Sequence, residues 1–311
     1  MTKKPSSKNK WKDIKKHWLL LLMTAPGLIY LVINNYLPML GIFIAFKEVN
    51  YSKGIFGSDW VGFQNFAYLF TTNDAWIITR NTLLYNGTFI LLTTVLAVGV
   101  AILLNEVRRK FFARFYQSVL LFPYLMSMVI VGYLVLAFLN AENGFVNNQL
   151  LPLLGMDYIS WYSESKYWPY ILTIVQLWKN VGYVCVVYFA AIIGIDQEYY
   201  EAAMLDGATR WQQIRSITIP LIAPIIVLMT LLGIGRIFYS DFGLFFQVPL
   251  NSGALQSTTD VIDTYVYRGL ITFGDIGMSS AAGLYQSLVG FILVLISNFI
   301  VRRKNRDMAL F

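Results

Sequence analysis

Two clusters of polar side chains lie within long apolar stretches of this 311-residue sequence. Ionisable groups in hydrocarbon cost roughly 2.5 to 3.5 kcal/mol on insertion scales, so those present usually face a cavity or a partner. Aromatic faces combined with hydrogen-bonding groups are the chemistry that recognises sugars, which makes both clusters candidates for lining a substrate path. Their members are Gln176, Lys179, Asn180 and Tyr183 in the first cluster, and Arg236, Tyr239 and Asp241 in the second.

The spacing of these residues predicts how helices would present them. Gln176, Lys179 and Tyr183 are spaced i, i+3, i+7, which places them on one stripe of a helix. The first two members of the second cluster are expected to share a helix face with Ser240. An alternative is that Lys179 and Arg236 pair with carboxylates or backbone carbonyls at an interface with a second subunit. Three further polar residues are expected to serve helix packing, namely Asn81, Asn86 and Ser287.

The segment 194–218, which separates two apolar stretches, is more patterned than a connector needs to be. Asp196 is a favourable N-cap for a short helix, and Gly207 can end that helix in the left-handed conformation without steric cost. Thr209 and Gln212 have the spacing of a capping box, which starts a second short helix. The segment is therefore predicted to form a helix, a glycine turn and a second helix.

This helix-turn-helix is best explained as a surface on which another protein docks. Small residues would let a partner approach closely, and Glu201 supplies a charge that fixes the register. A DNA-reading role is disfavoured because four acidic residues against two basic ones is the wrong balance for phosphate contacts. An amphipathic pair lying on the membrane stays an alternative. The expected docking residues are Glu201, Ala202, Ala203, Asp206, Gly207, Ala208 and Trp211, together with Pro220 near the first turn of the next helix.

Residues that commonly perform covalent chemistry are nearly absent. Cys185 is the only cysteine and lies in an apolar run, so a disulfide framework and a cysteine metal site are excluded. His17 is the only histidine and stands beside a lysine-rich start, which disfavours a catalytic triad or a histidine metal cluster. The sequence also lacks a glycine-rich phosphate loop ending in Lys followed by Ser or Thr. We therefore expect no catalysis and no bound cofactor or metal.

The elements that position these residues are membrane spans. Only 13% of the residues are charged, whereas soluble domains are about 25% charged. Crossing about 30 Å of hydrocarbon takes roughly 20 helical residues. Six stretches are long enough, which predicts an all-α integral membrane protein with spans at Trp18 to Phe46, Leu83 to Leu104, Val119 to Leu139, Tyr170 to Ile193, Ile219 to Ser240, and Ala281 to Val301.

Basic residues near the span ends predict the orientation, because lysine and arginine are retained in the cytoplasm. Seventeen lie in the N-terminus, in the loops after the second and fourth spans and in the C-terminus, against five in the alternate loops. Both termini and the segment 194–218 are therefore expected on the cytoplasmic side. The net charge of +7 is an orientation signal rather than a nucleic-acid footprint. The predicted regions are a basic N-terminus (1–17), a six-span domain (18–301) and a basic C-terminus (302–311).

The segment 194–218 is called the docking segment below. Seven residues in it and directly after it follow a characteristic spacing, in the order Glu201, Ala202, Ala203, three residues, Gly207, nine residues, Ile217, one residue, Ile219 and Pro220. This pattern resembles the signature of permease subunits of binding-protein-dependent ABC importers, except that Ile219 stands where the family usually has Leu. The resemblance extends over nearly the whole chain. Five further stretches resemble the oligosaccharide and polysaccharide branch of that family, which is common in Gram-positive bacteria, at residues 26–30, 44–47, 103–108, 206–214 and 260–268.

The resemblance implies a permease that moves a carbohydrate across the bacterial plasma membrane and leaves ATP hydrolysis to other chains. In such importers the helices at about 196–215 sit in a cleft of a cytoplasmic ATPase. Closure of two ATPase copies then switches two permeases between inward-open and outward-open states. The implied partners are a second, homologous six-span permease in a heterodimer, two copies of the ATPase, an extracellular lipid-anchored solute-binding protein and membrane lipid, with no nucleic acid.

Other classes of function fit less well. A self-contained secondary transporter would need a gradient-coupled site and often an inverted repeat. Neither is found, and such a transporter would give the patterned loop no purpose. A membrane enzyme is the poorest alternative because no clustered catalytic groups face either surface. An ABC permease for a solute other than a sugar stays open.

Overall fold

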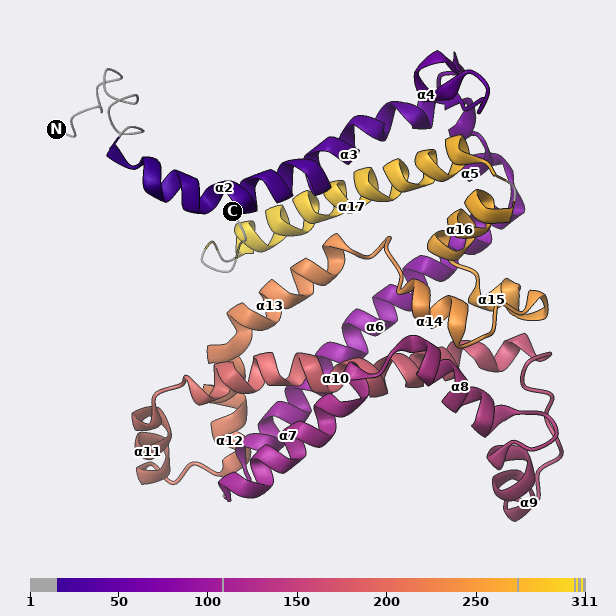
Figure 1. Ribbon diagram of the computed structural model, residues 1–311. Helices are drawn as coiled ribbons and strands as arrows, with labels where there is room; N and C mark the ends of the chain where they lie inside the picture. The colour runs from indigo at the N-terminus through magenta and orange to yellow at the C-terminus, as the bar shows by residue number, and fades with distance from the viewer. Residues whose placement is uncertain (1–15, 108, 273, 305, 307–308, 310–311) are drawn as a thin grey trace.

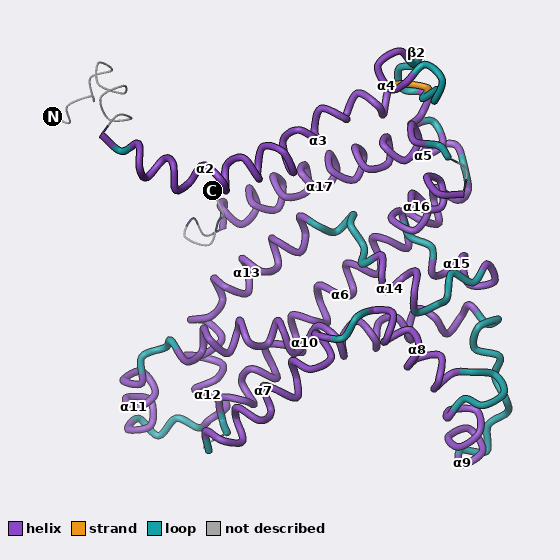
Figure 2. The backbone as a smooth tube through the Cα atoms, viewed as in Figure 1, coloured by secondary structure: helices purple, strands orange, loops and turns teal. Residues whose placement is uncertain are grey.

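The computed structural model describes residues 16–107, 109–272, 274–304, 306 and 309. Long helices run through the molecule, and shorter helices and loops gather at both of their ends (Figures 1 and 2). Within the described residues, five helices are long and apolar enough to cross a membrane, and a bent helix pair would make a sixth crossing. The prediction of an all-α protein with about six spans is therefore confirmed. The five helices are Trp18–Phe46, Asn73–Asn105, Ser165–Ile193, Arg210–Gly235 and Ile276–Arg303.

The long helices are built from several elements in chain order. The first comprises α2 (Trp18–Leu31), a π-helical turn (Val32–Tyr36), α3 (Leu37–Met39) and a 3-10 turn (Leu40–Phe46). The others contain α6 (Asn73–Asn105), α7 (Lys110–Leu125), α8 (Met128–Leu139), α10 (Trp168–Ile193), α13 (Ile219–Gly235) and α17 (Ile276–Lys304). Of the predicted basic N-terminus, only Lys16 and His17 fall within the described residues.

The shorter elements connect the spans. At one end of the spans lie α11 (Gln197–Leu205) and α12 (Arg210–Gln213), at the same end as the start of α2 and the end of α17 (Figure 1). At the opposite end lie α4 (Gly54–Gly57), α5 (Tyr68–Thr71), α9 (Leu151–Leu153), α14 (Phe242–Gln247), α15 (Gln256–Thr259) and α16 (Ile262–Thr272). The two-residue strands β1 (Lys47–Glu48) and β2 (Asp59–Trp60) pair antiparallel beside α4.

The third span, predicted at Val119 to Leu139, is broken into two helices. α7 ends at Leu125, α8 starts at Met128, and the two helices are bent by 94°. A new helix can start there because the Ser127 side chain caps α8, accepting a hydrogen bond from the Ile130 amide at 3.4 Å. The carbonyls at the end of α7 are satisfied by a residue from another span, described below.

The fifth span also ends earlier than predicted, at Gly235 rather than at Ser240. Glycine is a poor helix former, and the chain beyond it finds other partners for its carbonyls. Asn86 donates to the Ile237 carbonyl at 2.9 Å, and Gln286 donates to the carbonyl of the next residue at 2.7 Å. Polar side chains of two neighbouring spans thus replace the helical hydrogen bonds, which permits irregular backbone at this depth.

The first span stands largely apart from the rest of the chain. Only 6% of its most apolar window is buried, whereas the corresponding share is 17% to 28% in the other four long helices. Its second half lies along α17, and α2 projects beyond the helices behind it (Figure 1). Every residue of α2 except Ala25, which is half-buried, is exposed, so lipid or another subunit must cover this helix.

The spans pack most closely where small residues meet. Ala97 and Ala101 on α6 form a buried cluster with Cys185 on α10, and small residues let membrane helices approach. Gly182 on α10 touches α7 so closely that an added Cβ would lie 1.8 Å from the Leu120 carbonyl oxygen. These contacts fix α6, α7 and α10 as one unit, which positions the sites described next.

Candidate functional site

The segment between the fourth and fifth spans forms the predicted helix, glycine turn and helix. The N-cap Asp196 accepts a hydrogen bond from the Glu198 amide at 3.1 Å, and α11 follows. Gly207 has a φ of +77°, the left-handed conformation that glycine adopts without steric cost. α12 then begins with a capping box between Thr209 and Gln212. Local capping rules therefore account for the shape of this segment.

The second short helix differs from the prediction because it does not stop before the fifth span. A π-helical turn, Ile214–Thr218, joins α12 to α13, so one helix runs from Arg210 to Gly235. Pro220 stands in the first turn of α13. The Gln213 side chain is buried and donates to the Ala208 carbonyl at 3.1 Å, which ties the turn to the helix. The loop is therefore attached to the fifth span through continuous helix.

Large apolar side chains of this segment project into the surroundings. Leu205 is 90% exposed and Trp211 is 68% exposed. Neighbouring exposed apolar side chains at a loop usually mark a surface that a partner covers. The polar, small and proline residues predicted for docking are also accessible. Glu201, Ala202, Asp206, Gly207, Trp211 and Pro220 are exposed, and Ala203 and Ala208 are half-buried.

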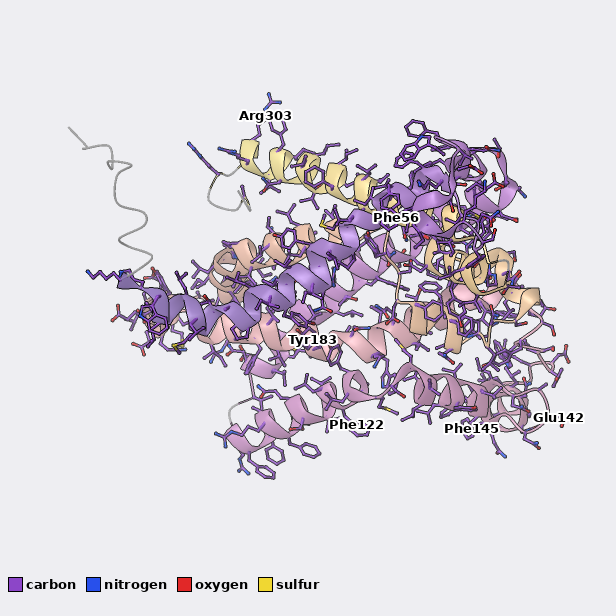
Figure 3. All side chains as sticks on the ribbon, turned by 45° about the horizontal axis from the view of Figure 1, so that its top comes forward. Phe56, Phe122, Glu142, Phe145, Tyr183 and Arg303 are labelled. Atoms are coloured by element: carbon purple, nitrogen blue, oxygen red, sulfur yellow. The ribbon has the colours of Figure 1, made fainter. Side chains whose placement is uncertain are left out.

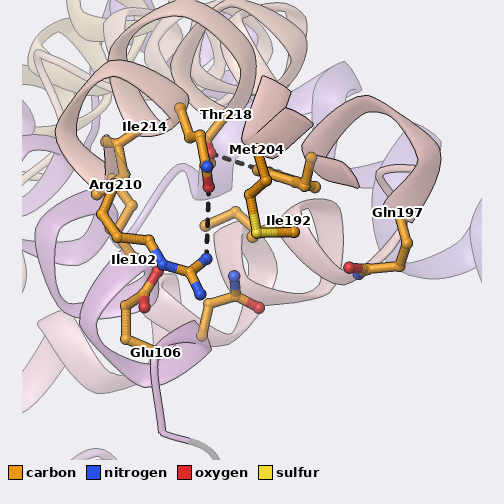
Figure 4. Close-up of a pocket in the computed structure, with 11 residues that line it drawn as sticks. Ile102, Glu106, Ile192, Gln197, Met204, Arg210, Ile214 and Thr218 are labelled. Carbon is orange, nitrogen blue, oxygen red and sulfur yellow. Dashed lines mark hydrogen bonds between the residues drawn. The ribbon is translucent and has the colours of Figure 1, made fainter. Parts of the chain in front are cut away.

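A polar pocket of about 250 Å³ lies behind the docking segment, between α11, α12 and the end of α6 (Figure 4). Glu106 of α6 and Arg210 of α12 both line it. The hydroxyls of Tyr200 and Thr218 are 2.9 Å apart, and Arg210 donates to the Gln213 side chain at 3.4 Å. The bond between Tyr200 and Thr218 connects α11 to the helix that continues into the fifth span.

Four of the seven predicted substrate-path residues line a single cavity of about 360 Å³ between α6, α10 and α13. Gln176 and Asn180 come from α10, whereas Arg236 and Tyr239 come from the turn after α13. The prediction that the latter two share a helix face with Ser240 was wrong, since the helix ends before them. The turn brings them to the cavity instead.

The other three candidates lie elsewhere. Lys179 and Tyr183 face α7, where the Tyr183 ring, labelled in Figure 3, stacks on Tyr124 with centroids 4.4 Å apart. Asp241 caps α14 by accepting a hydrogen bond from the Leu244 amide at 3.1 Å. None of the three belongs to the residues that line the 360 Å³ cavity.

Lys179 is 8% exposed, and its ammonium group caps the end of α7. Its Nζ donates to the carbonyls of Pro123 at 3.3 Å, Tyr124 at 2.9 Å and Met126. A cation at a helix C-terminus satisfies the orphan carbonyls and complements the helix dipole. The alternative for Lys179 was pairing with carboxylates or backbone carbonyls at an interface with a second subunit. Lys179 does pair with backbone carbonyls, but these belong to its own chain.

The turn after α13 is held by a carboxylate from α16. Asp263 accepts a hydrogen bond from the Ser240 amide at 2.8 Å and another from Gln286 at 3.3 Å. Burial raises the pKa of Asp263, and these two hydrogen bonds oppose that shift. The positions of Arg236 and Tyr239 therefore depend on contacts from two other helices.

Sequence reasoning missed several residues of the cavity, including Asn86, Thr94 and Tyr188. The signal was present as a strict i, i+4 series on α10, in which Gln176 and Asn180 are followed by Val184 and then Tyr188. The i, i+3, i+7 stripe chosen instead leads to α7. No charged residue of α6 lines the cavity, and the sequence explains Asn86 equally well as a helix-packing residue.

The fold and these sites define a class of protein: a multi-span membrane protein that presents an exposed helix-turn-helix at one end and a polar cavity between its spans. Comparison with known proteins identifies the family. Residues 90–306 match the family described as the binding-protein-dependent transport system inner membrane component. The chain therefore belongs to this family, as a multi-pass permease subunit of an ABC transporter, in agreement with the predicted resemblance.

Curated relatives extend over nearly the full chain. Protein LplB of Bacillus subtilis (strain 168) is 36% identical over 291 residues, covering 93% of this chain and 90% of that protein. The polygalacturonan/rhamnogalacturonan transport system permease protein YteP of the same organism is 33% identical, covering 91% and 88%. Among solved structures, a bacterial ABC transporter involved in import of the acidic polysaccharide alginate has a TM-score of 0.87 and 33% identity, covering 96% and 100%.

Proposed function

We propose that this chain is one half of the translocation path of a carbohydrate importer, driven by ATP hydrolysis on a separate protein. The observation that carries this proposal is the single helix from Arg210 to Gly235, because it joins an exposed docking segment to the cavity between the spans. A partner that moves the segment would move the cavity wall with it.

The docking segment is proposed to receive a cytoplasmic ATPase. Its exposed Leu205 and Trp211 supply apolar contact, and Glu201 supplies a charge at the edge of this surface. Large apolar side chains near the centre of an interface commonly carry most of its binding energy. Two ATPase copies would be needed, one for each permease. This assignment also places the two ends of the chain on the cytoplasmic side.

A second six-span permease is proposed to complete the path. The cavity lies on a surface of this chain rather than inside a closed ring of helices, and Arg236 and Tyr239 are exposed along it. The exposed first span offers additional surface for the same partner. One solved relative is a bacterial alginate transporter in complex with an alginate pentasaccharide-bound periplasmic protein. An extracellular, lipid-anchored binding protein is the corresponding donor proposed here.

The cargo is proposed to be an oligosaccharide or a polysaccharide fragment. The names of several relatives state carbohydrate cargoes, including starch degradation products for AmyD of Thermoanaerobacterium thermosulfurigenes, which is 27% identical. The lining of the cavity supports the same class, because amide, hydroxyl and aromatic groups all contribute to it. The path residues proposed from this chain are Gln176, Asn180, Arg236 and Tyr239.

The coupling part of the proposal can be tested at Gly207. Gly207→Val places a β-branched residue at a φ of +77°, whereas Gly207→Asn keeps a residue that tolerates this conformation. A Cβ at this position meets no other atom within 4 Å, so backbone strain is the only difference. We expect the Val variant to assemble but to uncouple ATP hydrolysis from uptake, and the Asn variant to behave nearly as wild type.

A second variant tests the charge. Glu201→Lys reverses an exposed side chain and leaves the spans intact. We expect co-purification of the ATPase to weaken and uptake to fall in parallel. Normal uptake together with normal ATPase co-purification in both Gly207→Val and Glu201→Lys would contradict the docking assignment.

A further inference from the structure

The 360 Å³ cavity contains one cation and no acid. Its polar lining consists of amides and hydroxyls apart from Arg236, whose guanidinium is the single charged group among the lining residues. None of the ion pairs found among the described residues involves Arg236, and no hydrogen bond to its side chain is formed there. Ionisable side chains in a span usually face a cavity or a partner, because a charge in the membrane is costly.

The carboxylates nearest in the chain already have other partners. Asp241 is used as the N-cap of α14, and Asp263 accepts hydrogen bonds from the Ser240 amide and from Gln286. The turn that carries Arg236 is thus fixed by its own contacts, and the guanidinium is left for something outside this chain. Arginine presents N–H donors in a planar fork that matches a carboxylate in two parallel hydrogen bonds.

Two further groups in the cavity lack partners. Tyr188 is fully buried, and its hydroxyl, which lies beside Thr94, makes no hydrogen bond of good geometry. The side-chain oxygen of Gln176 is likewise buried without a partner. A buried polar atom without a partner is rare in native structures. Both atoms can be satisfied by hydroxyl groups of a molecule in the cavity.

Tyr239 adds an aromatic ring at the mouth of the cavity. Its hydroxyl is held by Ser287 at 2.6 Å, so the ring has a fixed position and is 42% exposed. The cavity volume lies within the range of about 300 to 1,000 Å³ that is usual for small-molecule sites. One side of it faces away from this chain, where the proposed second permease would close it.

We propose that this cavity recognises an anionic carbohydrate, with Arg236 pairing with the carboxylate of a uronic acid unit. Tyr188 and Gln176 take hydrogen bonds with sugar hydroxyls, and the ring of Tyr239 covers a face of the sugar. The proposal rests on the carbohydrate import proposed above and narrows its cargo to acidic oligosaccharides. A neutral sugar would leave the arginine without a counter-charge.

The test measures uptake by cells that carry the complete transporter. The probes are trisaccharides of galacturonate, mannuronate, guluronate and glucuronate, each paired with its carboxyl-reduced neutral form of the same size. We expect at least one acidic probe to be imported in preference to its neutral form. Arg236→Met should lower uptake of that acidic probe about 10- to 100-fold, as expected for losing a charge-assisted hydrogen bond. Arg236→Lys, which keeps the charge, should lose less.

One variant serves as a control and a second tests the sugar contact. Arg303→Gln removes an exposed arginine at the end of α17, far from the cavity, and should not change uptake (Figure 3). Tyr188→Phe removes only the hydroxyl, so a merely structural role predicts unchanged uptake, whereas sugar contact predicts a loss of about fivefold or more. The amount of assembled transporter in the membrane is measured for each variant.

Three results would overturn the proposal. The first is import of neutral probes without any acidic one. The second is an equal loss of acidic and neutral uptake in Arg236→Met, and the third is loss of the partner permease from the complex in that variant, which would make Arg236 an assembly residue. Import of neutral probes that still depends on Gly207 would leave the proposed carbohydrate importer standing. Failure to import any of these sugars would overturn the proposed acidic cargo and would leave the family assignment unchanged.

Discussion

Replacing Lys179 with Met should destabilise the protein without changing the shape of its core. Methionine has nearly the same length and volume but cannot donate hydrogen bonds. The carbonyls of Pro123, Tyr124 and Met126 at the end of α7 would lose their common donor. The break between α7 and α8 would then contain unsatisfied carbonyls in an apolar setting.

The magnitude follows from the number of bonds. Each hydrogen bond from a charged donor contributes about 1.5 to 3 kcal/mol, so three bonds contribute about 4 to 9 kcal/mol. Lys179 is only 8% exposed, and the cost of removing its ammonium group from water offsets several kcal/mol of this gain. The net loss in Lys179→Met is therefore about 2 to 4 kcal/mol, or roughly 3 to 6 °C in the midpoint of thermal unfolding for a chain of this length.

The assay is thermal unfolding of the purified protein in detergent, with Lys166→Met as the matched control. Lys166 is 66% exposed and pairs with Glu164 at 3.3 Å, so its loss should change stability by less than about 1 kcal/mol. A midpoint for Lys179→Met within about a degree of the control would refute the capping role. Lost uptake at unchanged stability would instead return Lys179 to the substrate path.

Two further predictions concern packing and pH. Gly182→Ala should lower the free energy of unfolding by about 3 kcal/mol or more, because its Cβ would overlap the Leu120 carbonyl. Gly283→Ala, with open space around the Cβ, should leave this free energy unchanged or raise it by up to about 1 kcal/mol. Equal unfolding midpoints for the two variants would contradict this prediction. Because the pKa of Asp263 is raised above its ordinary 3.8, its contribution to folding is fully present at low pH and is lost as pH rises through the folded-state pKa. Asp263→Asn should therefore match or exceed wild-type stability at neutral pH, with the difference shrinking toward pH 4, and a pH-independent difference would show that the carboxyl does not titrate this way.

The docking segment could be predicted in detail because its geometry is set by neighbours in the sequence. Asp196, Gly207 and the Thr209–Gln212 capping box each act within a few residues, and the structure shows all of them. The spans could be predicted because length and hydrophobicity alone decide whether a helix can cross a bilayer.

The breaks in the third and fifth spans could not be predicted in this way. The residues on both sides of Met126 are predominantly apolar, and the ammonium that completes the end of α7 comes from Lys179, far along the chain. Likewise, the backbone after Gly235 depends on Asn86 and Gln286 of other spans. Contacts with distant parts of the chain decide where these helices end. Local spacing alone therefore predicted the wrong surroundings for the residues near these ends.

The uninterrupted helix from Arg210 to Gly235 has a mechanical consequence. Its 26 residues span about 39 Å at 1.5 Å per residue, so it acts as a lever with the docking segment at one end and the turn of Arg236 at the other. A tilt of about 10° about one end displaces the other by about 7 Å, simply from the length of the rod. A small rotation imposed at Trp211 by the proposed ATPase would thus displace the cavity wall at Arg236 by about the width of a sugar ring.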